Sequence, residues 1–114
     1  MIQGIGCDLV DLNRIDIHNE TFIKHILSPK EYACFESLSS EKRKREYLGG
    51  RFACKEAYLK AIGTGIGGKP FKEIEILNDD TGKPYINDDR ALVTLSHERE
   101  MVMAFVVISD ELHK

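Results

Sequence analysis

The stretch that most constrains how this chain folds is RFACKEAYLKAIGTG, which runs from Arg51 to Gly65. It forms the second half of a long helical pattern, and a glycine such as Gly63 commonly ends a helix. Lys55 and Glu56 lie inside that helix, and Lys60 lies on its last turns. A carboxylate, several cations and a glycine-rich backbone are thus close in sequence, a combination that suits a magnesium ion and a phosphate ester.

Length and composition place the chain among ordinary globular proteins. Its 114 residues suffice for a single domain, 1-114, and its 42% hydrophobic and 31% charged residues are usual for a soluble protein. No apolar run reaches the roughly 20 residues that cross a bilayer, and the first residues read as a strand without the features of a signal peptide. We therefore expect no membrane association.

The cysteines and the net charge indicate the cellular compartment and the kinds of partner to expect. Cys7, Cys34 and Cys54 are odd in number and lack CxxC spacing, so we expect no disulfide and no zinc site, and a cytoplasmic location. The formal net charge of −3 argues against a nucleic acid partner. An acidic partner would have to be held by a local basic patch.

The first segment, 1–10, alternates in the manner of a strand. Gly4 and Gly6 fall on one face of this strand, and small residues there indicate that another element packs closely against it. Asp8 is expected at the end of the strand, on the face that carries the glycines. Any chemistry of Asp8 would then take place where the strand meets its neighbour.

The later elements read as helices followed by strands. Ser28 and Glu31 form a capping box at the start of the second helix. In the long helix, Gly49-Gly50 indicates either a bend or a close approach by a neighbour. The order of elements predicts an α+β fold in which an antiparallel sheet packs against the long helix. Helices are predicted over 19–27, 29–37 and 41–62, strands over 71–77, 84–86, 91–97 and 101–108, and a hairpin turn over 78–83.

Asp8 and Glu56 are candidate ligands of a magnesium ion. This ion prefers oxygen ligands and often binds through one or two carboxylates, with waters and substrate phosphate completing its coordination. The spacing alone favours a simpler alternative, in which Asp8 caps a turn and Glu56 pairs with Lys60 one helical turn away.

The end of the long helix is a candidate phosphate site. The backbone N–H groups of Gly63, Thr64 and Gly65 can face an anion, and Lys60 can neutralise phosphate oxygens. A glycine cap followed by solvated lysines explains the same residues equally well.

Three further sets of polar residues each allow two interpretations. The basic run 42–45 is either a solvated helix face or a contact for phosphates or an acidic protein. Ser96 and His97 point to opposite faces of a strand, so they are poorly placed to act on each other as nucleophile and base. His97 is expected either to bind phosphate or adenine or to be a structural turn residue. Arg14 is either an ion-pair partner or a contact for an acidic protein.

Three motifs occur in one order along the chain: GIGCDLVDLNRI at 4–15, RFACKEAYLKAIGTG at 51–65 and LSH at 95–97. Together they resemble the holo-[acyl-carrier-protein] synthase family, the short bacterial 4′-phosphopantetheinyl transferases, over nearly the whole chain. The resemblance implies the α+β 4′-phosphopantetheinyl transferase fold and a homotrimer with active sites between subunits. It also implies transfer of 4′-phosphopantetheine from coenzyme A to a serine of apo-acyl carrier protein, with release of adenosine 3′,5′-bisphosphate, in support of fatty acid biosynthesis.

The resemblance gives roles to individual residues. It implies that Asp8 and Glu56 hold Mg²⁺ and that Arg14 contacts the acidic carrier protein. Lys55 is expected to act with these two carboxylates in catalysis by neutralising charge on the transferring phosphoryl group. Glu56 and a metal-bound water are both candidates for the base that takes the serine proton. The residues expected near coenzyme A are Lys44, Arg45, Lys60, Gly63, Thr64, Gly65, Ser96 and His97.

The chain departs from the family pattern at a few positions, none of which removes a proposed ligand. Gly49-Gly50 stands where an Ala-Gly step is more usual, and Cys7 and Cys54 stand where other small or apolar residues are typical. Two alternatives to the transferase are a non-catalytic module of the same fold that binds coenzyme A, a nucleotide or an acidic protein, and a nucleic-acid binder built on the basic run. The net charge and the lack of an aromatic platform argue against the nucleic-acid binder.

Overall fold

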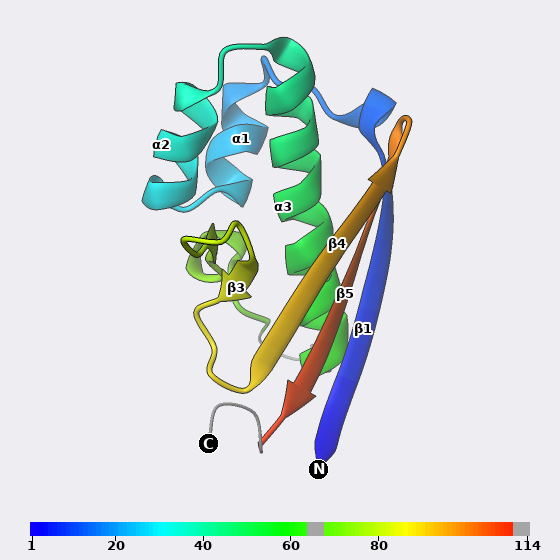
Figure 1. The fold of residues 1–114 in the computed structure, drawn as a ribbon. Helices are drawn as coiled ribbons and strands as arrows, with labels where there is room; N and C mark the ends of the chain where they lie inside the picture. Colours follow the sequence, from blue (N-terminus) through cyan, green and yellow to red (C-terminus); the bar gives the residue numbers. More distant parts are fainter. Residues whose placement is uncertain (64–67, 111–114) are drawn as a thin grey trace.

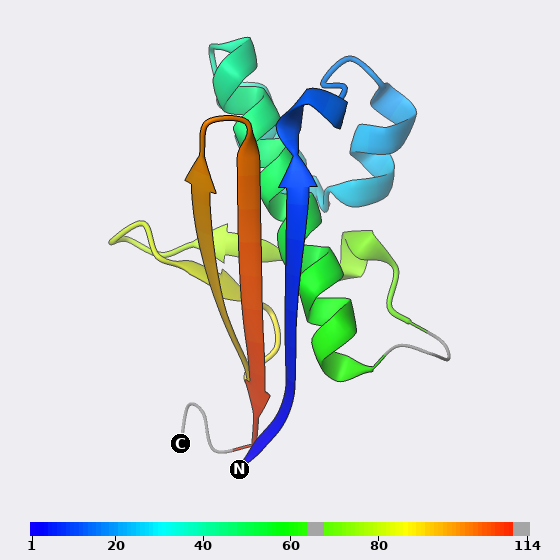
Figure 2. The ribbon, with the colours of Figure 1, turned by 90° about the vertical axis from the view of Figure 1, so that its right-hand side faces the viewer.

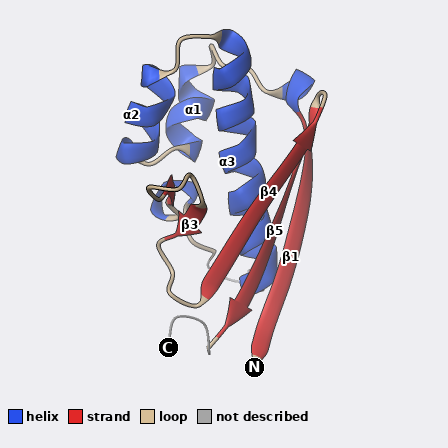
Figure 3. Ribbon diagram, viewed as in Figure 1, coloured by secondary structure: helices blue, strands red, loops and turns tan. Residues whose placement is uncertain are grey.

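A β-strand, a group of helices and then a group of strands follow one another along the computed structural model, which describes residues 1–63 and 68–110. Figure 3 distinguishes helices from strands and confirms the α+β class. The first part contains β1 (Ile2–Asp11), the 3₁₀ turn η1 (Leu12–Arg14), α1 (Glu20–Ile26), α2 (Pro29–Ser37) and α3 (Glu41–Ile62). The second contains the 3₁₀ turn η2 (Phe71–Glu73), β2 (Ile76–Asn78), β3 (Pro84–Ile86), β4 (Ala91–Glu98) and β5 (Met101–Ser109).

The long helix α3 lies between two layers (Figure 1). On one side lies an antiparallel sheet with the strand order β1-β5-β4. On the other side lie α1, α2 and a separate antiparallel pair, β2-β3. The predicted packing of an antiparallel sheet against the long helix is therefore confirmed, although β2 and β3 form a sheet of their own.

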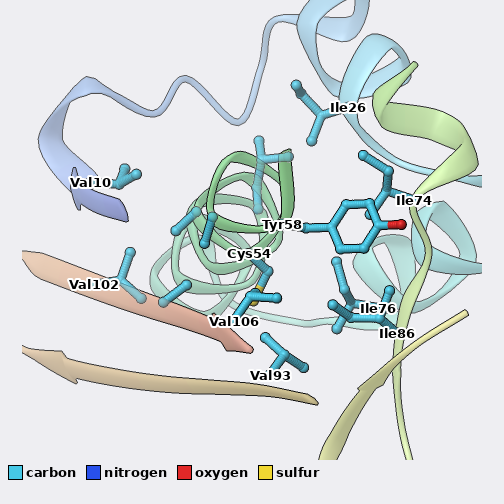
Figure 4. Packing of buried hydrophobic residues seen from close by; sticks show 14 of the residues in the cluster. Val10, Ile26, Cys54, Tyr58, Ile74, Ile76, Ile86, Val93, Val102 and Val106 are labelled. Atoms are coloured by element: carbon cyan, nitrogen blue, oxygen red, sulfur yellow. The ribbon is translucent and has the colours of Figure 1, made fainter. Parts of the chain in front are cut away.

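Buried side chains of α3 join the two layers, as Figure 4 shows around Cys54 and Tyr58. On the sheet side, Val102 and Val106 point inward from β5. On the other side, Ile74 and Ile76 pack near the ring of Tyr58. Burying each large aliphatic side chain stabilises the fold by about 1.5–3 kcal/mol, so α3 is held firmly on both sides.

Glycines allow the backbones of β1 and α3 to touch. A Cβ on Gly4 would overlap the carbonyl oxygen of Ala61, and a Cβ on Gly6 would overlap that of Ala57. The close approach predicted for this face of the strand is confirmed. A Cβ on Gly49 would overlap the side chain of Leu12, so at Gly49 the alternative of a close neighbour is also confirmed.

The helix ends follow local rules of capping. Ser28 and Glu31 form the predicted capping box at the start of α2. The side chain of Asn19 caps α1, and that of Ser40 caps α3 by accepting from the N–H of Arg43. Gly63 ends α3 with a φ of 72°, a left-handed conformation that favours glycine.

The strand predicted over 71–77 is wrong in its first half. Residues Phe71–Glu73 form the turn η2, in which the N–H of Ile74 donates to the carbonyl of Phe71 at 3.1 Å, and the strand begins only at Ile76. The carbonyl of Phe71 also accepts from the buried ammonium of Lys55 at 2.9 Å, so tertiary contacts override the local β propensity. In β1 the strand continues to Asp11, which places Asp8 inside the strand and not at its end.

Within the described ranges, no helix is both long and apolar enough to span a membrane. Cys7, Cys34 and Cys54 are all free thiols.

Candidate active site

Asp8 and Glu56 line one groove between β1 and α3. The groove has a volume of about 460 Å³, and the other side chains along it include Asp11, Arg14, Phe22 from α1 and Phe52 from α3. The tertiary structure thus joins two carboxylates that stand far apart in the sequence. This juxtaposition is the central feature of the candidate site.

The close contact of β1 with α3 places Asp8 beside Lys60. Asp8 follows Gly4 and Gly6 on the inward face of β1, where the strand touches α3. The ammonium of Lys60 donates to Oδ1 of Asp8 at 3.0 Å and to the carbonyl oxygen of Cys7 at 3.0 Å. Lys60 therefore pairs with Asp8 in β1, and not with Glu56 one turn earlier on its own helix.

The carboxyl group of Glu56 has a raised pKa. Burial is the largest cause and the negative charge of Asp8 the next, whereas the positive charge of Lys60 acts in the opposite direction. A carboxylate with a raised pKa is a stronger base than an ordinary surface glutamate. Asp8 and Glu56 thus lie near enough for the negative charge of one to act on the other.

The two carboxylates fit the kind of site that Mg²⁺ uses with phosphate substrates. Mg²⁺ commonly takes one or two protein carboxylates and completes its octahedron with water and phosphate oxygens. Over residues 1–63 and 68–110, no cluster of three or more His, Cys, Asp or Glu side chains forms a complete protein cage for a metal. Asp8 and Glu56 are thus suited to a cation that shares its coordination with a substrate.

The structure corrects the expected catalytic role of Lys55. This side chain has no exposed surface, and its ammonium donates to Oε1 of Glu31 and to the carbonyl oxygens of Ile26 and Phe71. An ammonium has only three N–H donors, and all of them are used here. Lys55 therefore faces the helical layer and cannot reach a phosphate in the groove.

Ser96 and His97 lie at a second, smaller hollow, with a volume of about 140 Å³, between α3 and the end of β4. In the sheet register Ser96 is opposite the exposed Met103, whereas His97 is opposite the buried Val102, so the two residues belong to opposite faces. The imidazole of His97 lies 3.5 Å from a carboxylate oxygen of Glu46. Neither Ser96 nor His97 lines the groove of Asp8 and Glu56.

The other predicted site residues are spread along α3 and η1. Lys44 lies beside α2, with its ammonium 4.0 Å from Glu36 and 5.2 Å from the ring centre of Phe35. Arg45 is half-buried on the next position of the helix. Arg14 is an exposed residue of the groove lining, and Gly63 is the cap of α3. Thr64 and Gly65 lie outside the described residues.

Sequence reasoning missed residues that both hollows use. Phe22 and Phe52 form an apolar wall of the groove, with ring centres 5.7 Å apart. Arg51 and Glu46 line the smaller hollow beside His97. The position of Phe52 one turn before Glu56 on a helix was a usable signal, whereas the approach of Phe22 depended on the folded structure.

Comparisons with known proteins show the family of the chain. A family model described as the 4′-phosphopantetheinyl transferase superfamily matches residues 4–106. A holo-[acyl-carrier-protein] synthase of Geobacillus sp. is 51% identical over 116 residues, covering 95% of this chain and 97% of that protein. The corresponding enzyme of Enterococcus faecalis is 44% identical over 118 residues, covering 97% of this chain and 100% of its own length.

A solved structure has a closely similar fold. The holo-[acyl-carrier-protein] synthase of Bacillus anthracis, in complex with CoA (3′,5′-ADP), superposes with a TM-score of 0.85 at 42% identity and covers 95% of this chain and 96% of its own. The similarity therefore extends over nearly the whole of both chains.

Proposed function

This chain belongs to the 4′-phosphopantetheinyl transferase superfamily, and we propose that its groove between β1 and α3 is where the transfer takes place. The reaction moves 4′-phosphopantetheine from coenzyme A to a serine hydroxyl of apo-acyl carrier protein, which makes the chain an enzyme of the holo-[acyl-carrier-protein] synthase type. The observation that carries the assignment of the site is the meeting of Asp8 and Glu56 in one groove, with Lys60 hydrogen-bonded to Asp8.

The transfer forms one phosphorus–oxygen bond and breaks another. The serine oxygen bonds to the phosphorus that carries the pantetheine, and the bond from that phosphorus to the bridging oxygen breaks. The electron pair of the broken bond leaves with adenosine 3′,5′-bisphosphate. Positioning and charge stabilisation are the main contributions that a protein can make to such a step.

Glu56 is the proposed acceptor of the serine proton. Burial and the charge of Asp8 raise the pKa of this carboxyl group, whereas a bound Mg²⁺ would lower it, so the proposed role as base rests on the place of Glu56 in the groove. Lys60 holds Asp8 through its 3.0 Å hydrogen bond, and its partly exposed ammonium can also donate to phosphate oxygens in the groove.

Asp8 and Glu56 are the proposed ligands of Mg²⁺. When bound there, the cation supplies positive charge that offsets the negative charge of the pyrophosphate. The fit of two carboxylates to a cation that is shared with substrate supports this choice.

The remaining predicted contacts concern the two substrates. Arg14, exposed at the groove, is proposed to attract the acidic carrier protein. Gly63, Thr64, Gly65, Lys44 and Arg45 remain proposed contacts of coenzyme A, together with Ser96 and His97. Within one chain, His97 and Glu56 line separate hollows. We therefore propose that the active site lies between subunits, where the groove of one subunit and the His97 hollow of its neighbour can contact the same coenzyme A molecule.

We propose a homotrimer because a site between subunits requires an oligomer. The outer face of the β1-β5-β4 sheet supports this proposal. Large apolar side chains point away from α3 on this face, among them Ile5, Leu9, Met103 and Phe105. A contiguous exposed apolar surface commonly marks a protein interface. We further propose that the enzyme acts in the cytoplasm and supports fatty acid biosynthesis.

The decisive experiment incubates the protein with coenzyme A, Mg²⁺ and apo-acyl carrier protein and weighs the carrier by mass spectrometry. The wild-type chain is expected to add one phosphopantetheine, and EDTA is expected to abolish the addition. Glu56→Gln keeps the size of the side chain but removes its charge, so we expect transfer to fall by about 10²-fold or more while the fold stays intact. Near wild-type transfer by that variant would contradict the site, and no mass gain with several carriers would contradict the function.

A further inference from the structure

A buried ion pair lies on the side of α3 that faces away from the sheet. The ammonium of Lys55 and the carboxylate of Glu31 have no exposed surface and are in direct contact. Oε1 of Glu31 also accepts from the N–H of Ser28 at 2.8 Å, and Oε2 accepts from the N–H of Ile76 at 2.8 Å. Every polar atom of the pair is therefore used inside the protein.

The pair connects segments that form the surroundings of the groove. Lys55 donates to the carbonyl of Ile26, the last residue of α1, and to that of Phe71, the first residue of η2. α1 carries Phe22, which lines the groove and packs edge-on against Phe52. Phe71 also packs against Phe52, with the two ring centres 5.9 Å apart.

These contacts bear directly on the position of Glu56. Lys55 and Glu56 are consecutive residues of α3, so they project in different directions from the same turn. Lys55 attaches α1 and η2 to this turn, while Glu56 projects into the groove that α1 helps to form. A shift of α1 relative to α3 therefore changes the distance between the aromatic wall and the catalytic carboxylate.

We propose that Glu31 and Lys55 are positioning residues for phosphopantetheine transfer, because together they hold α1 and η2 against α3 and so fix the aromatic wall of the groove relative to Glu56. The inference rests on the proposed function of the Asp8–Glu56 groove. Neither residue touches substrate, so their effect on the reaction is transmitted through Phe22 and Phe52.

Stability alone is a weak reason for such a pair. Apolar residues of similar volume often replace a buried ion pair with little or no loss of stability. What apolar residues cannot reproduce is a single ammonium that binds two carbonyls and a carboxylate from three different segments at once. The specific contribution of the pair is thus the relative placement of those segments.

The test compares four variants: Lys55→Met, Glu31→Gln, the double variant Glu31→Gln/Lys55→Met, and the control Ile108→Ala. Each single change leaves one charge buried without its partner, whereas the double variant leaves none, so its Tm is expected to exceed that of Lys55→Met. Ile108 is buried in β5 and lines neither hollow, so its truncation lowers stability without touching α1. The values of kcat and of KM for coenzyme A and carrier protein are measured well below the lowest Tm, and hydrogen exchange reports the protection of α1 and η2.

Lys55→Met and the double variant are expected to lose roughly 10- to 100-fold in kcat, since small misplacements around a reacting group have effects of that size. Ile108→Ala is expected to keep the wild-type kcat per folded molecule. The amides of α1 and η2 are expected to exchange faster in both Lys55 variants. Recovery of wild-type kcat and protection in the double variant would overturn the proposal, as would equal losses of kcat in Ile108→Ala.

The wild-type chain in the same assay separates this proposal from the proposed function. Absence of transfer by the wild type would refute the function, and the exchange data alone would then decide whether the pair holds α1 and η2. Transfer by the wild type together with full activity of Lys55→Met would refute only the positioning role.

Discussion

At the scale of single residues, the chemistry of the groove depends on the neighbouring charges of Asp8, Glu56 and Lys60. Lys60 is hydrogen-bonded to Asp8, and the charges of both shift the pKa of Glu56. The negative charge of Asp8 raises the pKa of Glu56 and the positive charge of Lys60 lowers it, so the two neighbours act with opposite sign. This opposition can be measured without any substrate.

We expect Glu56 to titrate above the ordinary value of 4.5 in the wild-type chain. Asp8→Asn removes a charge that disfavours ionisation of Glu56, so the pKa of Glu56 should fall. Lys60→Met removes a charge that favours ionisation, so the pKa should rise above the wild-type value. Carbon-13 NMR of the glutamate carboxyl groups in metal-free buffer measures all three titrations, and equal pKa values in the three proteins would contradict the described arrangement.

The same scale shows where sequence reasoning about single residues succeeded and where it failed. The sequence makes Glu56 and Lys60 candidates; Glu56 lines the groove, and Lys60 hydrogen-bonds to Asp8, which also lines it. Lys55, the immediate neighbour of Glu56, was expected to join them and does not. Consecutive side chains on a helix point about 100° apart, so Lys55 and Glu56 face different neighbours. Only the packing of α1 and α2 around α3 shows that Lys55 is buried and Lys60 is exposed.

At the scale of elements, the site depends on the contact between β1 and α3. The inward glycines of β1 let the strand rest on the backbone of α3, which brings Asp8 within reach of Lys60. Any side chain that separates these elements should therefore weaken the fold and the site together.

Gly6→Ala is expected to destabilise the protein, because its Cβ would overlap the carbonyl oxygen of Ala57 and lie 2.8 Å from the nitrogen of Ala61. Both atoms belong to helix backbone, so β1 has to move, at a cost of about 1–3 kcal/mol or more. Thermal denaturation should show a Tm several degrees lower than that of the wild type.

Gly50→Ala is the matched control for this substitution. Its nearest contact would be the side chain of Leu95 at an ordinary 3.6 Å, and alanine favours a helix by up to about 1 kcal/mol over glycine. We expect an unchanged or higher Tm. A Gly6→Ala protein as stable as Gly50→Ala would show that β1 and α3 do not touch as described.

At the scale of the whole molecule, one face of the sheet packs on α3, and no other element within residues 1–63 and 68–110 covers the opposite face. Figure 2 views this outer face, with β5 between β4 and β1. Cys7 lies opposite Phe105 and Leu9 opposite Met103 across the β1-β5 pair, so the apolar side chains form one patch. Such a patch is expected to be covered in solution.

Phe105→Asp should convert the proposed trimer into monomers, because a charge at the centre of the patch would be buried on assembly. Light scattering coupled to size-exclusion chromatography measures the mass, and phosphopantetheine transfer should fall along with it if the site lies between subunits. Tyr85→Asp on β3 is the control, since Tyr85 is more exposed than Phe105, at 48% against 37%, and lies outside the patch. A trimeric Phe105→Asp protein, or a monomeric wild type, would refute this assembly.

The sequence by itself determined the features that rest on local physics. Alternation of side chains, the capping box at Ser28 and the glycine at the end of α3 identified most elements, because these signals lie within a few neighbouring residues. The motif order indicated the family, and the inward glycines of β1 indicated a close contact without naming the partner.

Only the tertiary structure decided which side chains meet. In the folded chain, Asp8 is hydrogen-bonded to Lys60 and shares a groove with Glu56. Lys55 forms a buried ion pair with Glu31, and His97 lines a separate hollow. The tertiary structure also turned the expected strand at Phe71 into a 3₁₀ turn. The physical reason is common to all of these cases: the contacts join residues far apart in the chain, and their energies depend on burial and on distances that exist only after the layers have packed around α3.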